Sequence, residues 1–431
     1  MIEERKYWDP ELETMPLEKL KKLQEEKLQA TVTHAYNNTK FYRRKFDQAG
    51  VKPADINVLD DLQKLPLIES AEEFRKASFL DRLAVPLGQV RSVTSSSGTT
   101  GVPDIIPFTK SDWESLIYQA EPRIRWTHGI RPTDVVQVLT NFRCCERAPE
   151  TLGAMVIRAD AGRGNLDNQI RVAQAMGVTV IEHLPSLVLR YFERAKELGF
   201  DIRQSKIRLI SGVGESWAEA FKKRIEAEYG IPFRTAYGCI ELAAAGVAGV
   251  ECEAGNGMHI SSDCIIVEVI DPETLRPLGF GEEGELVVTP LVNEAMPVIR
   301  LRTGDVASLL PYKPCPCGRT HPKMSVVKGR LAHIVKVKGK KILPIDVEEV
   351  VASIPSLGNE YQIILDKPGE LERLKVKVEA KAEVKDIKAL QKQVEEALVQ
   401  SLGVDTEVEL VPIGILSRSL FKAERLITSY K

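Results

Sequence analysis

The sequence predicts an α/β fold with a large N-terminal domain and a small α+β C-terminal domain. Three observations predict it. Between residues 112 and 232, apolar runs typical of buried strands alternate with helical patterns, as in parallel βαβ units with helices on both faces of a sheet. From 257 to 309 the strands become shorter and are separated by Gly and Pro turns, as in an antiparallel sheet or small barrel. After Gly329 and Arg330, strands and a helix indicate a compact α+β unit.

We expect the large domain to span 1–330 and the small one to span 331–431. Residues 1–75 carry apolar positions at helical spacing, which predicts a helical lead-in. Residues 76–256 then form the α/β part, and 257–330 form the β-rich part. The predicted strands are Val135–Leu139, Ala154–Ile157, Val178–Ile181, Ile207–Ile210, Cys264–Ile270, Glu285–Thr289 and Ile334–Lys338.

The composition is that of an ordinary globular protein, with 43% hydrophobic and 28% charged residues. A formal net charge of −2 gives no electrostatic footprint for nucleic acid or an anionic membrane, so we expect neither as a partner. No apolar run approaches membrane-spanning length, and the first residues lack the apolar core of a signal peptide, which predicts a cytoplasmic protein. Seven cysteines in a chain this long do not make a disulfide scaffold, which leaves metal binding or simple burial.

One stretch, from Ser95 to Thr109, has the sequence SSSGTTGVPDIIPFT. Its two glycines let the backbone turn N–H groups toward one centre, and its hydroxyls add further donors. This chemistry suits the phosphates of a nucleotide. The alternative is a solvated linker, since the stretch matches neither the Walker pattern nor a GxGxxG loop. The candidate phosphate-binding residues are Ser96, Ser97, Gly98, Thr99, Thr100 and Gly101.

Three charged positions suit the same ligand. Glu241 follows a turn at Tyr237 and Gly238 and could serve Mg²⁺, which prefers one or two carboxylates beside phosphate oxygens; the alternative is a glutamate at the start of a surface helix. Asp305, in an Arg-Thr-Gly-Asp loop, can accept hydrogen bonds from the hydroxyls of a ribose, or is a turn residue. Lys422, on a mobile small domain, can bring a point charge to a carboxylate and an α-phosphate, or lies on a solvated helix face.

Taken together, these loops resemble the motif series of the adenylate-forming superfamily of acyl-CoA synthetases, adenylation domains and luciferases. Within it, the chain is most similar to the phenylacetate-CoA ligase family, because FYRRKF at 41–46 and AGVKP at 49–53 resemble that family's N-terminal helical segment. The similarity extends from there to Arg425. The matching segments are SSGTTGxP at 96–103, YGxxE at 237–241, RTGD at 302–305, GR at 329–330 and the terminal Lys422.

This resemblance implies an ATP-dependent ligase that forms an acyl-adenylate and pyrophosphate from an aryl or related carboxylic acid, then a thioester with coenzyme A. It implies that the loop at 96–101 holds the ATP phosphates, that Glu241 acts with Mg²⁺ and that Asp305 binds the ribose. Arg330 would lie at the domain hinge, and Lys422 would assist adenylation. Further nucleotide contacts are implied at Glu215, Ala236, Tyr237 and Gly238. A homodimer is compatible with these expectations.

A separate group of residues suits a metal. Cys252, His259, Cys315 and Cys317 offer three thiols and one imidazole, which fit tetrahedral Zn²⁺, although their spacing is atypical and buried thiols are the alternative. Their segments, ECEAGNGMH and CPCGRTH, resemble segments of phenylacetate-CoA ligase relatives with bound zinc. The resemblance therefore implies a structural zinc that staples the β-rich part, with His321 as a substitute ligand.

Several positions depart from the family pattern. Ile240 stands where a Ser or Thr usually precedes the glutamate, and Ala332 with His333 replaces an acidic pair after Gly-Arg. Phe421 replaces the glycine before the terminal lysine, and Asp104 stands where many superfamily members, but not phenylacetate-CoA ligases, have lysine. These substitutions leave open a nucleotide-binding protein without catalysis.

The largest departure lies between Asn141 and Leu152, where the segment is shorter and poorer in glycine and aromatic residues than the family's acyl-pocket stretch. The identity of the acid therefore stays open, as does adenylyl transfer to a different acceptor, as in coenzyme F390 synthetases. Arg143 and Arg147 suit either an acidic substrate or solvent. We expect the neighbouring thiols, Cys144 and Cys145, to be buried.

Overall fold

The computed structural model describes residues 5–68, 71–95, 105–139, 143–158, 165–417 and 424–430. The chain forms two compact units, Met1–Ile157 with Arg234–Val326 and Arg158–Phe233 with Val327–Lys431. Parallel strand pairs, an antiparallel β-rich sheet and a C-terminal α+β part are all present, so the predicted α/β fold class is confirmed. Within the described ranges, no helix is both long and apolar enough to cross a bilayer.

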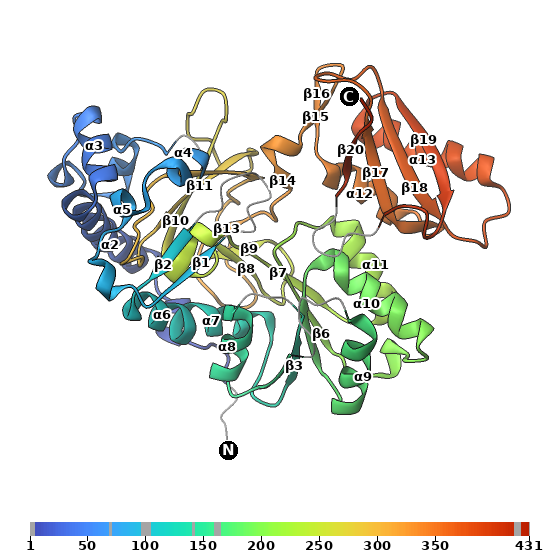
Figure 1. The fold of residues 1–431 in the computed structure, drawn as a ribbon, viewed down its shortest axis with the longest axis horizontal. Coiled ribbons are helices and arrows are strands. Elements are labelled where there is room, and N and C mark those ends of the chain that lie inside the picture. Colours follow the sequence, from blue (N-terminus) through green and yellow to red (C-terminus); the bar gives the residue numbers. More distant parts are fainter. Residues whose placement is uncertain are drawn as a thin grey trace. The chain divides into compact units, whose positions relative to one another are not determined.

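The first unit begins with five helices, α1 (Pro10–Glu13), α2 (Leu17–Asn38), α3 (Lys40–Ala49), α4 (Ala71–Lys76) and α5 (Phe79–Arg82), of which α2 to α5 are blue in Figure 1. Thr39 separates α2 from α3. Its hydroxyl donates to the Ala35 carbonyl at 2.8 Å and accepts the Tyr42 N–H at 3.1 Å, so one residue ends one helix and caps the next. The buried Tyr42 hydroxyl accepts the Ile299 N–H at 2.8 Å, which ties these helices to the β-rich part.

The β-rich part of this unit holds two antiparallel sets of strands. In the first set, β11 (Gly284–Pro290) lies between β10 (Ile265–Ile270) and β12 (Leu301–Ala307). All seven residues of β11 are buried. The second set runs in the order β13 (Lys323–Met324), β9 (Met258–Ile260), β8 (Gly249–Glu251) and β7 (Phe233–Tyr237).

The remaining strands and helices of the first unit carry the predicted phosphate loop and the segment after it. They are the antiparallel pair β1 (Ser92–Ser95) and β2 (Ile105–Phe108), the parallel pair β3 (Val135–Val138) and β4 (Met155–Ile157), and α6 (Lys110–Ser115), α7 (Glu121–His128) and α8 (Arg143–Thr151). Short turns of helix lie at Pro53–Asp55, Leu59–Lys64, Leu87–Gln89, Leu116–Ala120 and Ile240–Ala245.

The second unit combines an α/β portion with the C-terminal α+β portion. The first comprises the parallel pair β5 (Val180–His183) and β6 (Leu209–Val213) with α9 (Leu166–Met176), α10 (Pro185–Glu197), a short turn at Ile202–Gln204 and α11 (Glu219–Tyr229). The second comprises β14 (Gly329–Arg330), a turn at Leu331–His333, β15 (Val335–Val337), β16 (Lys340–Ile342), α12 (Pro344–Ser353), β17 (Leu357–Leu365), β18 (Leu374–Ala380), α13 (Ile387–Leu402), β19 (Thr406–Pro412) and β20 (Leu426–Thr428).

The C-terminal portion, orange to red in Figure 1, has its own hydrophobic core. Its four-stranded sheet runs in the order β19-β18-β17-β20. Val347 of α12 and Val394 and Leu398 of α13 are fully buried in the same cluster as Tyr361 and Ile363 of β17. The helices therefore pack on this sheet through their apolar faces, as expected of an α+β unit.

Two strands of the α/β portion begin later than predicted. β5 begins at Val180 rather than Val178, because the Val178 N–H still bonds the Ala173 carbonyl of α9 at 3.1 Å as the chain leaves the left-handed Gly177. β6 begins at Leu209 rather than Ile207, whose N–H is taken by the Ser205 hydroxyl at 3.1 Å. Local side-chain and helix-end hydrogen bonds compete here with the sheet ladder.

Asp112 fixes the segment that follows β2. Its carboxylate accepts the Thr109 N–H at 3.0 Å, and the Thr109 hydroxyl accepts the Asp112 N–H at 3.0 Å, which is a capping box. The same carboxylate accepts the N–H groups of Glu294 at 2.6 Å and Ala295 at 2.9 Å. Asp112 is 1% exposed, so it joins the end of β2 to the loop at 293–295 through a buried charge.

We predict that Asp112→Ala lowers the free energy of unfolding by about 2–4 kcal/mol, because the N–H groups of Thr109, Glu294 and Ala295 lose a buried, charged acceptor. Urea unfolding measures the change. Glu114→Ala is the matched control, since Glu114 lies on the same helix, is exposed and pairs with the exposed Lys110. Equal stability of the two variants would contradict this role of Asp112.

Candidate functional site

The sequence-predicted site residues divide into those the structure describes and those it does not. Ser96, Ser97, Gly98, Thr99, Thr100, Gly101 and Lys422 lie outside the described residues, as do Asp104 and Phe421. The described strand β1 ends at Ser95, before the predicted phosphate loop, and β2 begins at Ile105, after it. Ala236, Tyr237, Gly238, Glu241 and Asp305 belong to the first unit, and Glu215 and Arg330 belong to the second.

Tyr237 and Asp305, predicted from separate motifs, are in direct contact. Tyr237 ends β7, and its hydroxyl donates to Asp305 Oδ2 at 2.7 Å. Burial and then the Asp305 carboxylate hold the pKa of Tyr237 well above its ordinary value, so the phenol stays a neutral donor. The result is an oriented carboxylate, which suits it to accept hydrogen bonds from paired hydroxyls.

The backbone around Asp305 explains its position. Gly304 has a left-handed φ of 75°, which favours glycine, and its N–H donates to Glu285 Oε1 at 3.0 Å. The Asp305 N–H donates to the Thr303 hydroxyl at 3.0 Å, and Thr303 donates to the Leu286 carbonyl at 2.9 Å. The RTGD segment, predicted as a loop, thus lies within β12 and is fixed by the neighbouring strand β11.

Glu241 is 4% exposed and pairs with a cation from the N-terminal helices. Arg75 Nη2, on α4, donates to Glu241 Oε1 at 3.0 Å. The Glu241 carbonyl accepts from Asn293 Nδ2 at 3.2 Å, and Asn293 Oδ1 accepts the Ala244 N–H at 3.1 Å. Sequence reasoning missed Arg75, because Glu-Glu-Phe-Arg-Lys has the pattern of a solvated helix face.

Glu215 and Arg330 are placed within the second unit. The Glu215 carboxylate accepts the N–H of Ser186 at 2.9 Å and its hydroxyl at 3.1 Å, at the beginning of α10. This arrangement caps the positive end of that helix. Arg330 lies at the end of β14 and is exposed.

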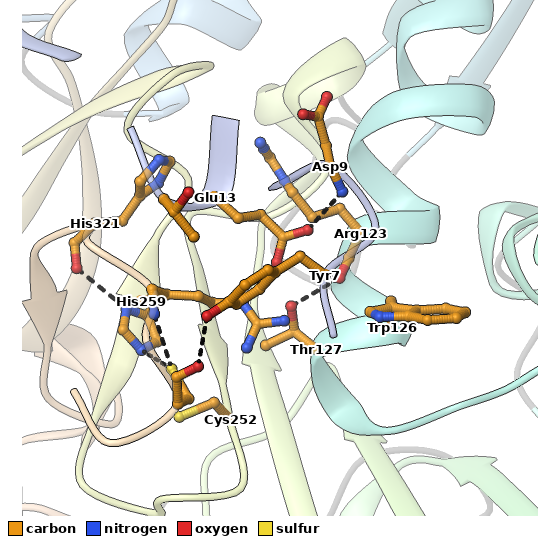
Figure 2. A network of polar contacts seen from close by, with 12 residues as sticks. Tyr7, Asp9, Glu13, Arg123, Trp126, Thr127, Cys252, His259 and His321 are labelled. Atoms are coloured by element: carbon orange, nitrogen blue, oxygen red, sulfur yellow. Dashed lines mark hydrogen bonds and ion pairs between the residues drawn. The ribbon is translucent and has the colours of Figure 1, made fainter. Parts of the chain in front are cut away.

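Cys252, His259, Cys315 and Cys317 come together as one buried cluster, with all four ligand atoms within 4.8 Å of one another. The Sγ atoms of Cys252 and Cys315 are 3.7 Å apart, and Cys317 Sγ is 3.4 Å from His259 Nε2. Figure 2 shows Cys252 and His259 next to each other in this cluster. Cys252 directly follows β8 and His259 lies in β9, whereas Cys315 and Cys317 lie in the loop before β13. Residues 63 positions apart are thus joined by a set of donors that matches a tetrahedral zinc site.

Hydrogen bonds around the cluster set the protonation of His259 and Cys317 in a way that favours metal binding. His259 Nδ1 lies 3.1 Å from the His321 carbonyl, so it carries the proton and leaves Nε2 as a lone-pair donor facing the thiols. Hydrogen bonds from the Cys252 thiol and the Arg319 N–H hold the pKa of the Cys317 thiol below its usual range. The His321 ring is not a ligand in this arrangement, because its two nitrogens contact the carbonyls of Ile260 and Leu12.

The N-terminal segment from Tyr7 to Met15, which we call the N-terminal strap, lies against the same loop. The Tyr7 hydroxyl donates to the Cys317 carbonyl at 3.1 Å. Thr320 donates its N–H to the Glu13 carbonyl at 3.1 Å and its hydroxyl to the Met15 carbonyl at 2.6 Å. Arg319 Nε donates to Glu13 Oε2 at 2.7 Å, with both side chains buried. These contacts join residues about 300 positions apart, so no local pattern could have predicted them.

The segment at 143–152 settles two sequence expectations. Cys145 is buried, as expected, and accepts a hydrogen bond from Arg125 Nη2 at 3.3 Å. Arg147 is exposed and pairs with Glu150 at 3.0 Å, which agrees with a solvated arginine. The side chains of Arg143 and Cys144 lie outside the described part of the chain.

The sequence matches two models of one enzyme family. The model described as "AMP-binding enzyme" matches residues 18–290, and that described as "AMP-binding enzyme C-terminal domain" matches 339–429. The phenylacetate-coenzyme A ligase of Thermus thermophilus is 32% identical, covering 96% of this chain and 97% of the relative. That of Escherichia coli is 33% identical, covering 97% of this chain and 96% of the relative.

Solved structures of 2-hydroxyisobutyryl-CoA ligase are similar over the whole chain. In the postadenylation state with an acyl-AMP bound, the match has a TM-score of 0.92 at 26% identity, covering 100% of this chain and 94% of the other. With acyl-AMP and CoA in the thioesterification state, the TM-score is 0.72 at 27% identity, with the same coverage.

We predict that Glu13→Gln lowers the free energy of unfolding by about 3–5 kcal/mol, because Arg319 would be left buried without its carboxylate. Chemical denaturation measures the change. Glu11→Gln, at an exposed position of the same helix, is the control and should change stability by less than about 0.5 kcal/mol. A loss below 1 kcal/mol in Glu13→Gln would count against a strap held by this ion pair.

Proposed function

The chain belongs to the AMP-binding enzyme family, and from this premise we propose that it is an ATP-dependent acid–CoA ligase. The observation that carries the proposal is identity of 32–33% to phenylacetate-coenzyme A ligases over 96–97% of the chain. The acid is an aryl or related carboxylic acid. The enzyme joins it to AMP with release of pyrophosphate and then to the thiol of coenzyme A.

Binding of the nucleotide is assigned to the loops described above. The hydroxyls and N–H groups of 96–101 hold the phosphates, and the Asp305 carboxylate accepts hydrogen bonds from the ribose hydroxyls. Tyr237 orients that carboxylate through its 2.7 Å hydrogen bond. Glu215, Ala236 and Gly238 line the nucleotide as further contacts.

In the first step, a carboxylate oxygen of the acid forms a bond to the α-phosphorus while the bond from that phosphorus to the pyrophosphate oxygen breaks. Both reactants are anionic, so the step depends on nearby positive charge and on positioning. Lys422 supplies a cation to the reacting groups. Glu241 fits Mg²⁺ because it is a buried carboxylate, and the ion when bound neutralises charge on the phosphate oxygens.

In the second step, the sulfur of CoA forms a bond to the acyl carbon and AMP leaves with the electrons of the acyl–oxygen bond. The C-terminal domain rotates about the hinge at Arg330 between the two steps. The proposed domains, 1–330 and 331–431, meet at this residue.

The cluster of Cys252, His259, Cys315 and Cys317 holds a structural Zn²⁺. Three observations support this: four donors within 4.8 Å, full burial, and a His259 tautomer that turns Nε2 inward. A closed four-ligand site leaves no open position for a substrate. The ion therefore holds together the segment that carries Cys252 and His259 and the loop that carries Cys315 and Cys317. The N-terminal strap is held with them, because it is bonded to that loop.

We predict ATP–pyrophosphate exchange that requires Mg²⁺ and a carboxylic acid from a pooled library. Asp305→Ala should lower exchange at least about tenfold, and Tyr237→Phe about fivefold, since each loses contacts worth about 1 kcal/mol or more. Mass spectrometry of the products separates the acceptors: acyl-CoA supports the proposal, whereas acyl-AMP without CoA turnover supports another acceptor. Absence of exchange with every acid in the library would refute the proposal.

We predict about one zinc ion per purified chain, measured by inductively coupled plasma mass spectrometry. Cys317→Ser should lose most of the zinc and show a lower Tm. Cys264→Ser is the matched control, because Cys264 is also buried but lies outside the cluster. Equal zinc contents in the two variants would contradict the assigned ligand set.

A further inference from the structure

Helix α11 begins without a cap of its own. Ala218 occupies its N-cap position and has no side chain that could accept a hydrogen bond. The first N–H groups of a helix have no partner within the helix, and the positive end of the helix dipole lies there. A cap must therefore come from another part of the chain.

Two consecutive glutamates of α12 supply the missing acceptors. Glu349 accepts the Ala220 N–H with both carboxylate oxygens, Oε2 at 3.0 Å and Oε1 at 3.2 Å. Glu348 Oε2 lies 3.4 Å from the Ala218 nitrogen and accepts its N–H. These contacts cross about 130 residues of sequence and join the C-terminal portion to the portion at 158–233, all within the second unit.

Two further hydrogen bonds between described residues cross the same contact. Arg224 of α11 donates to the Leu357 carbonyl at 2.8 Å, and Asn359 donates to Glu193 of α10 at 3.1 Å. The hydrophobic core of the C-terminal portion lies inside that portion, between its helices and its own sheet. Polar contacts of this kind exchange for water at small net cost, so they suit a contact that forms and breaks.

We propose that Glu348 and Glu349 are positioning residues that latch the C-terminal domain onto α11 for adenylation and release it for thioester formation. The inference rests on the proposed two-step ligase reaction. The relative compared above has solved structures in both states, and this chain is much more similar to the postadenylation state than to the thioesterification state. The glutamate contacts thus occur in a chain that resembles the first of the two states.

The two glutamates differ in their surroundings. Glu349 is exposed, whereas Glu348 is half-buried beside Arg425, Tyr361 and Glu215. Burial raises the pKa of Glu348 from 4.5 to about 7; Glu215 and Glu349 also raise it, while Arg425 and the Ala218 N–H oppose the shift. Latching therefore takes up a proton. The protonation of Glu348 therefore stabilises the latched contact fully below pH 4.5, and this stabilisation is lost as the pH rises through 7.

The test compares the two half-reactions in the full-length enzyme. Glu349→Ala should lower ATP–pyrophosphate exchange about tenfold while transfer of the acyl group from purified acyl-AMP to CoA is retained or faster. Glu219→Ala is the matched control, because Glu219 is an exposed carboxylate at the same end of α11 that pairs with Lys223. It should leave both rates within about twofold of the original.

A second readout needs no activity. Hydrogen exchange of the Ala218 and Ala220 amides should become faster in Glu349→Ala but not in Glu219→Ala. Equal losses in both half-reactions, or unchanged amide exchange, would overturn the latch. If the unmodified enzyme performs neither half-reaction with any acid but its amide protection depends on Glu349, the proposed function fails while the contact itself stands.

The pH dependence of the two half-reactions tests the role of Glu348 separately from that of Glu349. The ratio of acyl transfer to pyrophosphate exchange should rise between pH 6 and pH 8 in the unmodified enzyme. Glu348→Gln imitates the protonated carboxyl and should hold this ratio near its pH 6 value. A variant whose ratio rises with pH as steeply as that of the unmodified enzyme would contradict the role of Glu348.

Discussion

The hydrogen bond between the Tyr237 hydroxyl and the Asp305 carboxylate is the contact on which the proposed nucleotide site depends. It joins β7 to β12 across 68 residues of sequence and fixes which way the carboxylate points. That position in turn depends on β11, where Glu285 holds both the Gly304 N–H and the Arg302 side chain. A ligand that needs two hydroxyls accepted at once can be bound only if this carboxylate is held before the ligand arrives, which lowers the ordering cost of binding.

Elsewhere in the first unit, buried charged side chains are likewise held by partners from distant parts of the chain. Glu241 takes its cation from α4, Arg319 takes its carboxylate from the N-terminal strap, and Arg123 of α7 pairs with Asp263 at 2.9 Å. A charge in a low-dielectric interior is costly without a partner, so each pair tolerates only the arrangement that brings both members together. The ion pairs thus favour the arrangement in which α1, α4 and α7 lie against the segments that carry Arg319, Glu241 and Asp263.

Local patterns in the sequence were sufficient for much of the fold. The strand at 135–138, the antiparallel strands of the β-rich part and the Cys and His donors could all be predicted from periodicity, turn residues and side-chain chemistry. Arg75, the N-terminal strap and the Glu349 cap could not, because each acts on a group far away in sequence and has an ordinary local context. His321 shows the limit most clearly: its side chain suggested a ligand, but it is its backbone carbonyl that orients His259.

The distribution of apolar and polar contacts explains how one chain could serve two reactions. The C-terminal portion buries Val347, Val394 and Leu398 among its own strands, so its stability does not depend on what it touches. Its contacts with α10 and α11 include hydrogen bonds in which Glu349 accepts the Ala220 N–H, Arg224 donates to the Leu357 carbonyl and Asn359 donates to Glu193. An apolar surface in their place would hold the domain more tightly and would have to be exposed to water at each release, at about 25 cal/mol for every Å². A polar contact avoids that penalty, and the missing cap of α11 gives it a definite place to form.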